Sequence, residues 1–136
     1  MQPEKLIRSL IDDVFNNGNL SMLDAIIHPE YQYKSPAGTL QGIEQLKEFI
    51  QAFRRAFPDL SLQIEDFFAH DDRSCTAFTL KGTHEEDFME IPATKKSVLV
   101  QGMVMSRFKD GKISEDWEIL DNLSLFQQLG VIPELP

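Results

Sequence analysis

The 136-residue sequence predicts an α+β protein, in which N-terminal helices pack on a strongly curved, antiparallel or mixed sheet. Apolar residues recur every three or four positions up to residue 57 and then alternate with polar residues from residue 60 to 122. Helical and strand-like stretches are grouped rather than interleaved, which argues against a parallel βαβ sheet. The length suits one domain, so we expect a single domain over residues 1–136.

Three amphipathic segments predict the helices. In the first, the apolar residues form one stripe, which Asn16-Asn17-Gly18-Asn19 ends. The third begins at Gly42 and stops at Phe57-Pro58-Asp59, because proline cannot continue a helix. The expected elements of this half are helices at 3–15, 20–27 and 42–57, a short strand at 31–34 and a turn at 35–38.

The second half predicts a meander of long strands. The expected strands are residues 61–69, 74–83, 97–108 and 112–122. Short links join most of them, and Asp110-Gly111 is the strongest hairpin signal. Strands of nine to twelve residues cannot lie flat because of their twist. We therefore expect the sheet to curl, with Gly102 as a bend point, and to leave a cavity at the open end of a cone.

Composition excludes several classes of function. The chain has 13 Lys and Arg against 22 Asp and Glu, a formal net charge of -9, so neither nucleic acid nor an anionic membrane is an expected partner. Cys75 is the single cysteine, which rules out an internal disulfide and a zinc signature, so no metal is expected. The first residues alternate charged and apolar side chains, unlike a signal peptide, and a cytoplasmic location is expected.

Asp121 is the main candidate for acid/base chemistry. Strict alternation places Trp117, Ile119 and Asp121 on one face of the last strand, and Glu118 and Leu120 on the other. A carboxyl group on an apolar, aromatic face should hold its proton more tightly, which suits general acid/base catalysis near neutral pH. The alternative is equally open: Asp121 caps the segment that follows or forms a salt bridge at the rim.

Other residues are weaker candidates. His84, at the end of a strand, is the best second proton-transfer candidate because its ordinary pKa is nearest neutrality, although a lone histidine is usually structural. Gln101 and Met103 share a face of the third long strand and could contact a ligand, although methionine there more often fills a core. Phe78 is included among the expected ligand contacts, although ten phenylalanines mainly build a core.

Several short motifs, in order, resemble one protein family. They are Phe57-Pro58-Asp59-Leu60, Lys81-Gly82-Thr83-His84, Ile91-Pro92-Ala93-Thr94-Lys95-Lys96, Phe108-Lys109-Asp110-Gly111-Lys112-Ile113, Trp117-Glu118-Ile119-Leu120-Asp121 and Gln128-Leu129-Gly130. Together, their order and spacing resemble the SnoaL-like polyketide cyclase, or ester cyclase, family over nearly the whole chain. The resemblance implies the cystatin-like, nuclear transport factor 2-like cone and a homodimer formed through the sheet.

The resemblance also implies a function. Cyclases of this family close a ring by intramolecular aldol condensation without metal or cofactor, with an aspartate at the position of Asp121 as general acid/base. We therefore expect a cofactor-independent cyclase or isomerase-type enzyme that binds a small hydrophobic carbonyl compound, with Asp121 and His84 catalytic and Gln101, Trp117, Met103 and Phe78 lining the pocket. The alternative is a non-catalytic ligand-binding or dimerisation module on the same fold.

One loop departs from the family pattern. After Gly-Thr-His the family usually reads Gly-x-Phe-x-Gly-x-Pro-Pro-Thr-Gly-Lys, and the corresponding stretch here has Glu86, Glu90 and Lys95 in place of the three glycines. Charged residues in place of glycine restrict the loop's backbone and put negative charge near the mouth of the expected pocket.

Overall fold

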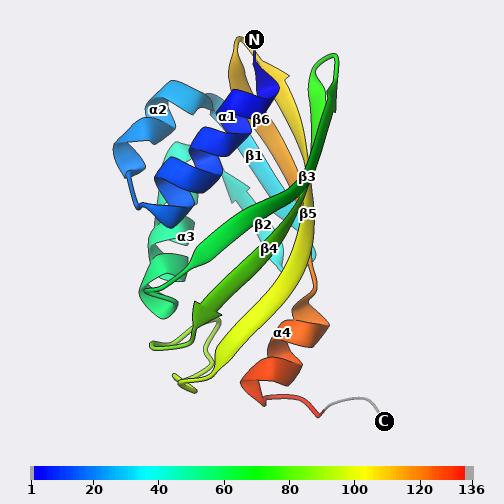
Figure 1. The fold of residues 1–136 in the computed structure, drawn as a ribbon. Helices are drawn as coiled ribbons and strands as arrows, with labels where there is room; N and C mark the ends of the chain where they lie inside the picture. Colours follow the sequence, from blue (N-terminus) through cyan, green and yellow to red (C-terminus); the bar gives the residue numbers. More distant parts are fainter. Residues whose placement is uncertain (1, 134–136) are drawn as a thin grey trace.

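The computed structural model describes residues 2–133 and shows a curved six-stranded sheet with helices on its concave side (Figure 1). The elements in chain order are α1 (Pro3–Arg8), η1 (Ser9–Asn16), η2 (Leu20–Met22), α2 (Leu23–Ile26), β1 (Ile27–Ser35), β2 (Gly38–Gln41), α3 (Gly42–Ala56), β3 (Ser61–His70), β4 (Arg73–Thr83), β5 (Ser97–Lys109), β6 (Lys112–Leu120) and α4 (Asn122–Leu129). This arrangement confirms the predicted α+β class.

The strand order is β2-β1-β6-β5-β4-β3, and the sheet is mixed. Strands β3 to β6 form the predicted antiparallel meander, whereas β1 pairs with β6 in parallel. The parallel pairing places the first strand of the chain beside the last one. Helix α3 packs against β1 and β2, at the end of the sheet where β1 also pairs with β6.

Two clusters of buried apolar side chains hold the helices on the sheet. The first joins η1, β1 and α3, with Val14, Ile27 and Ile50 completely buried. The second joins the end of α3 to β4, β5 and α4, through residues such as Phe57, Val100 and Leu125. Helix α4 therefore closes the end of the cone that lies away from α1 and α2 (Figure 1).

The structure differs from the predicted elements mainly near the N-terminus. The expected second helix at 20–27 is present as a 3₁₀ turn followed by one α-helical turn and ends at Ile26. The strand expected at 31–34 is longer, because β1 already begins at Ile27, which is completely buried. A further strand, β2, follows the turn at Pro36-Ala37 and pairs with β1. Four residues are too few to show a period of two, which is why the pattern did not reveal this strand.

Gly102 lies in the middle of β5 and faces the concave side. A Cβ atom at this position would lie 2.6 Å from Cζ of Phe78 and 3.1 Å from the carbonyl oxygen of Ile119. The missing side chain therefore leaves room for the Phe78 ring inside the cone.

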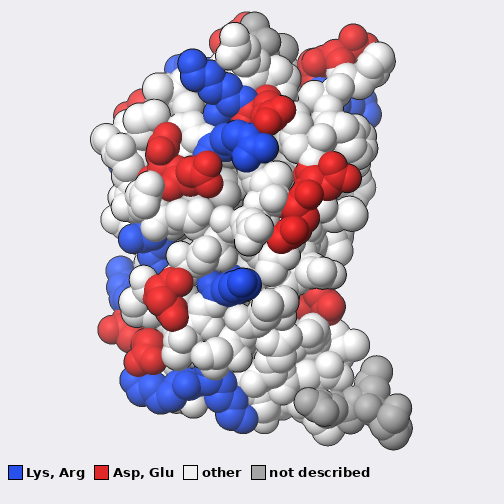
Figure 2. Space-filling view, viewed as in Figure 1, with Lys and Arg blue, Asp and Glu red and all other residues white. Residues whose placement is uncertain are grey.

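Charged side chains are interspersed over the face shown in Figure 2 and form no large patch of one sign there. Within residues 2–133, none of the helices combines the length and the hydropathy that crossing a bilayer requires.

Candidate functional site

A largely apolar cavity lies between the concave face of the sheet and the helices. The space open to the centre of a water molecule amounts to about 60 Å³. Its walls come from α1, η1, α3 and five of the strands, and they include the aromatic rings of Phe15, Phe49, Phe53 and Phe78. Among the described residues 2–133, the polar side chains that line it are four: Tyr31, Tyr33, Asp116 and Glu118.

Strand β6 places two carboxyl groups in this cavity. Asp116 and Glu118 are two residues apart, so alternation directs both side chains to the concave face. Asp116 is only 4 % exposed, whereas Glu118 and the next inward residue, Leu120, are half-buried. The cavity is thus deepest at Asp116 and becomes more accessible toward the C-terminal end of β6.

Each carboxyl group accepts a hydrogen bond from a tyrosine of β1. The Tyr31 hydroxyl donates to Oδ2 of Asp116 at 2.7 Å, and the Tyr33 hydroxyl donates to Oε1 of Glu118 at 2.7 Å. The parallel pairing of β1 with β6 produces both contacts, because a step of two residues along each strand repeats the same relation. Oδ1 of Asp116 accepts a further bond of 2.5 Å from Ser106, its cross-strand neighbour on β5.

The cavity raises the proton affinity of these groups. Burial raises the pKa of Asp116, although the hydrogen bonds from Ser106 and Tyr31 act in the opposite direction. Burial is also the main cause that raises the pKa of Glu118 from 4.5 to about 7, with a smaller contribution from the charge of Asp116. Burial and the neighbouring carboxylates raise the pKa of Tyr31 and Tyr33, so both phenols stay protonated donors at neutral pH.

The two acids are therefore suited to different tasks. Both oxygens of Asp116 already accept hydrogen bonds from neighbouring side chains, which fixes its position. Oε2 of Glu118 receives no hydrogen bond from residues 2–133 and lies at the more accessible part of the cavity. A carboxyl group with one free oxygen and a pKa of about 7 can both take up and release a proton near neutral pH.

Asp121 lies outside this cavity. It is exposed, and its Oδ1 accepts a hydrogen bond of 3.1 Å from the backbone N–H of Ser124, which makes it the N-cap of α4. Of the two interpretations that the sequence left open, this geometry agrees with the helix cap. The burial that the catalytic interpretation requires is absent at this position.

The other residues expected to line the pocket divide between the two faces of the sheet. Phe78 lines the cavity. Gln101, Met103 and Trp117 lie on the convex face instead, where Met103 is 58 % and Trp117 56 % exposed. The alternation along β6 agrees with the prediction, but the cavity lies on the face opposite to the expected one. The pattern alone does not distinguish the two faces, because both faces of β5 and β6 carry large apolar residues.

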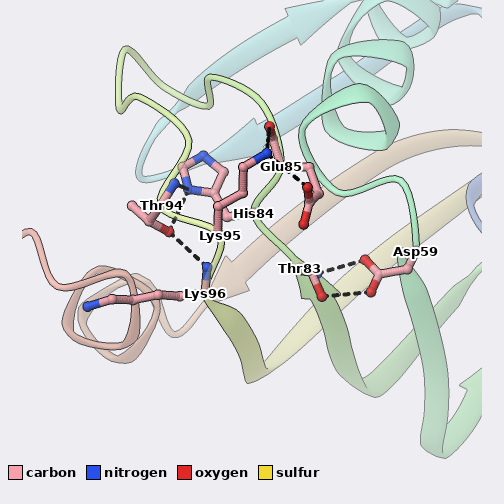
Figure 3. A network of polar contacts seen from close by, with 7 residues as sticks. All are labelled: Asp59, Thr83, His84, Glu85, Thr94, Lys95 and Lys96. Atoms are coloured by element: carbon pink, nitrogen blue, oxygen red, sulfur yellow. Dashed lines mark hydrogen bonds and ion pairs between the residues drawn. The ribbon is translucent and has the colours of Figure 1, made fainter.

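His84 is completely buried beside the cone rather than in the cavity wall. Its Nδ1 accepts a hydrogen bond of 3.2 Å from the backbone N–H of Thr94 and lies 3.0 Å from the Thr94 hydroxyl (Figure 3). Its ring stacks on Phe57, with 5.4 Å between the ring centroids. Beside it, Asp59 accepts two hydrogen bonds from Thr83 (Figure 3), which lower the pKa of Asp59. His84 thus anchors the loop at 84–96.

That loop keeps the backbone shape that glycine would favour. Glu90 and Lys95, two of the charged residues at family glycine positions, have φ angles of 65° and 61°. Non-glycine residues adopt this left-handed region at a cost of about 1 to 2 kcal/mol. Lys95 also forms an ion pair of 3.0 Å with Glu85 (Figure 3).

Asp116, Tyr31 and Tyr33 were not among the functional candidates predicted from the sequence, and Glu118 was predicted only to lie on the face opposite Asp121. The sequence did contain a signal. Tyr31 and Tyr33 are two residues apart, as are Asp116 and Glu118, so each pair lies on one face of its strand. Nothing in the sequence indicated that β1 pairs with β6. Among residues 2–133, no group of three or more His, Cys, Asp or Glu side chains is arranged to hold a metal ion.

Comparisons with known proteins agree with this architecture. The structure of TsrD from Streptomyces laurentii superposes with a TM-score of 0.88 at 28 % identity, covering 96 % of both chains. IdmH from Streptomyces antibioticus, a candidate polyketide cyclase, has a TM-score of 0.83 at 31 % identity, covering 96 % of this chain and 99 % of its own. A protein from Jannaschia sp. CCS1, assigned to the SnoaL-like polyketide cyclases, shares the fold at 20 % identity with a TM-score of 0.87, covering 96 % and 92 %.

A search of curated protein sequences found no match. The sequence model of the SnoaL-like polyketide cyclases, in contrast, matches residues 5–129, from α1 to the end of α4. The likeness that the ordered motifs suggested is thereby confirmed, and the chain belongs to the SnoaL-like polyketide cyclase family.

Proposed function

We propose that this protein is a cofactor-independent acid/base enzyme, of the aldol cyclase or isomerase type, that acts on a small hydrophobic carbonyl compound bound in the cone. The observation that carries the proposal is Glu118: a carboxyl group with one free oxygen, in an apolar cavity, with a pKa of about 7. Enzymes that move protons at carbon use carboxyl groups tuned in this way.

In the proposed reaction, ionised Glu118 removes a proton from the carbon next to the substrate carbonyl. The C–H electron pair moves into the carbonyl to form an enolate, and the proton stays on Oε2 of Glu118. Once Glu118 is neutral, the Tyr33 hydroxyl no longer faces a charged acceptor and can donate to the enolate oxygen. In an aldol closure the enolate carbon then attacks a second carbonyl carbon, and the oxygen of that carbonyl takes the proton from Oε2 of Glu118. In an isomerisation, a different carbon of a conjugated enolate takes this proton instead.

Because Asp121 is exposed, caps α4 and does not line the cavity, we assign the proposed proton-moving role to Glu118 instead of Asp121. Asp116 positions Tyr31 through their 2.7 Å hydrogen bond and maintains the polar end of the cavity. We assign His84 the task of holding the loop at 84–96 through Thr94.

The test is proton exchange at carbon. Phenylacetone, a small ketone with an apolar body, is incubated with the protein in D₂O, and deuterium uptake beside its carbonyl is followed by proton NMR. We expect Glu118→Gln to lower the protein-dependent exchange rate by about 100-fold or more, and Asp121→Asn to change it less than twofold. The opposite pattern would return the role to Asp121, and no exchange with wild-type protein would favour the non-catalytic binding module.

We also propose that the protein forms a homodimer through the convex face of the sheet. The support is a group of large apolar side chains on β5 and β6 that are 45 to 58 % exposed: Leu99, Met103, Met105, Trp117 and Ile119. Met103 and Ile119 are cross-strand neighbours, and so are Met105 and Trp117, so the patch is continuous.

Ile119→Lys would place a charge in the centre of this patch. We expect this variant to be a monomer when its molecular mass in solution is measured by sedimentation equilibrium. The control variant Gln51→Lys, on the exposed side of α3, should keep the molecular mass of the dimer. A wild-type protein that sediments as a monomer at all concentrations would remove the proposed dimer.

A further inference from the structure

Hydrogen-bond donors and acceptors are unequally available in the cavity. Each of the two tyrosines has one O–H, and each donates it to a carboxyl group. Asp116 accepts bonds at both oxygens. Glu118 accepts at Oε1 only, and no donor from residues 2–133 reaches its Oε2.

With Glu118 ionised, the free hydrogen-bonding positions of these side chains are therefore all acceptors. They are Oε2 of Glu118 and the remaining lone pairs of the two tyrosine oxygens. Among residues 2–133, no Lys, Arg or His lines the cavity, so no side chain there can neutralise an anionic ligand. The hydroxyls of Ser74 and Thr76 are buried without partners, but these residues lie outside the lining.

We propose that the cavity recognises the hydroxyl group of a small neutral hydroxyaromatic compound, such as a phenol, by accepting its hydrogen bond at Oε2 of Glu118, and that it rejects carboxylates and phosphates. This inference rests on the proposed function only in using the same cavity, since it concerns binding and not turnover. It assigns Glu118 a role in choosing ligands in addition to its proposed role in moving protons.

The shape of the cavity agrees with a ligand that enters with its hydroxyl first. The inner space of about 60 Å³ is smaller than the cavity of about 150 Å³ that holds a benzene ring. The hydroxyl group therefore occupies the space beside Glu118, and the ring extends toward the half-buried side chains of Phe49 and Leu120. Phe49 already lies 5.5 Å from the ring of Tyr33, in a tilted arrangement that a further aromatic ring can join.

A protonated amine would also donate a hydrogen bond, but the cavity disfavours charge. Its lining is mainly apolar, and burial raises the pKa of Glu118 to about 7, which shows how poorly the site solvates an ion. A neutral hydroxyl keeps the hydrogen bond without the cost of desolvating a cation. Benzylamine therefore serves as a competing probe.

The test is a titration of ¹⁵N-labelled protein with phenol, anisole, benzoate and benzylamine at pH 8, followed by two-dimensional NMR. Anisole has the ring and the oxygen of phenol but no donor. We expect phenol to bind about tenfold more tightly than anisole, benzoate to give no saturable shifts, and the perturbed signals to centre on β1 and β6. Equal binding of phenol and anisole, tighter binding of benzoate or benzylamine, or no binding of any probe would overturn the inference.

Two further measurements locate the acceptor. In Glu118→Leu the preference for phenol over anisole should fall to about one. In Asp121→Asn, which changes an exposed residue outside the cavity lining, the preference should remain. A measurement on wild-type protein at pH 5 needs no variant: Glu118 is then protonated, its Oε2 carries a proton, and the preference should shrink. Asp116, Tyr31 and Tyr33 are the other titratable groups that line the cavity, and neither tyrosine ionises in this range.

Binding and turnover can fail separately. A preference for phenol that depends on Glu118, without exchange in phenylacetone, would leave the ligand inference standing and remove the enzyme. Exchange that depends on Glu118, without a preference for phenol, would do the opposite.

Discussion

Both faces of β6 carry large apolar side chains and have an acid on or next to them, and yet the two faces have different roles. On the concave face, Asp116 and Glu118 lie among apolar side chains, accept hydrogen bonds from tyrosines and have raised pKa values. On the convex face, Trp117 and Ile119 are more than half exposed, and Asp121, just beyond the strand, caps a helix. An acid beside an aromatic residue is thus a candidate for catalysis only if the rest of the fold covers its face of the sheet.

The largest difference between the faces should appear when Asp116 is replaced. Asp116→Ala leaves the buried hydroxyls of Tyr31 and Ser106 without their acceptor, so we expect the free energy of unfolding to fall by about 3 to 5 kcal/mol. Gln101→Ala on the convex face should change it by less than about 0.5 kcal/mol. Urea denaturation measures both, and equal losses would contradict the contrast between the faces.

The second-largest effect should be the contribution of Glu118 to the pH dependence of the free energy of unfolding. Its pKa is about 7 in the folded protein and 4.5 in the unfolded chain, so the folded protein holds this proton more tightly. The contribution of Glu118 to the free energy of unfolding is fully present below pH 4.5 and is lost as the pH rises through 7. The loss amounts to about 3 kcal/mol, because each unit of difference between the two pKa values corresponds to about 1.36 kcal/mol.

Comparison with Glu118→Gln isolates this contribution, because other groups titrate equally in both proteins. Asp59, for example, has a lowered pKa and contributes in the opposite direction, losing stability as the pH falls. The difference in unfolding free energy between wild-type protein and the variant should change between pH 4.5 and 7. A difference that stays constant over this range would show that Glu118 is solvated like a surface acid.

The smallest of these effects should come from Asp121. Asp121→Ala removes the acceptor for the backbone N–H of Ser124 at the start of α4, and loss of such a cap costs about 1 kcal/mol. Asp121→Asn should retain most of the stability, because asparagine also caps helices. Thermal unfolding compares the two, and a large loss with asparagine would point to a role of the charge itself.

The sequence predicted the fold class and most of the elements. The meander from β3 to β6 matches the expected strands to within two residues, because long alternating patterns separated by short turns leave few other arrangements. The ordered motifs predicted the family. The helix 42–57 was also clear, because its apolar stripe is uninterrupted and Pro58 ends it.

Only the tertiary structure decided which acid lies in the cavity. The period of two assigns Trp117 and Asp121 to one face and Glu118 to the other, but it does not say which face the helices cover. Both faces carry enough apolar residues to resemble an interior, since the convex face bears the exposed apolar patch. Pairing of β1 with β6 is a long-range contact that no local pattern encodes. It brings Tyr31 and Tyr33 to the two acids, each 85 positions away in the chain.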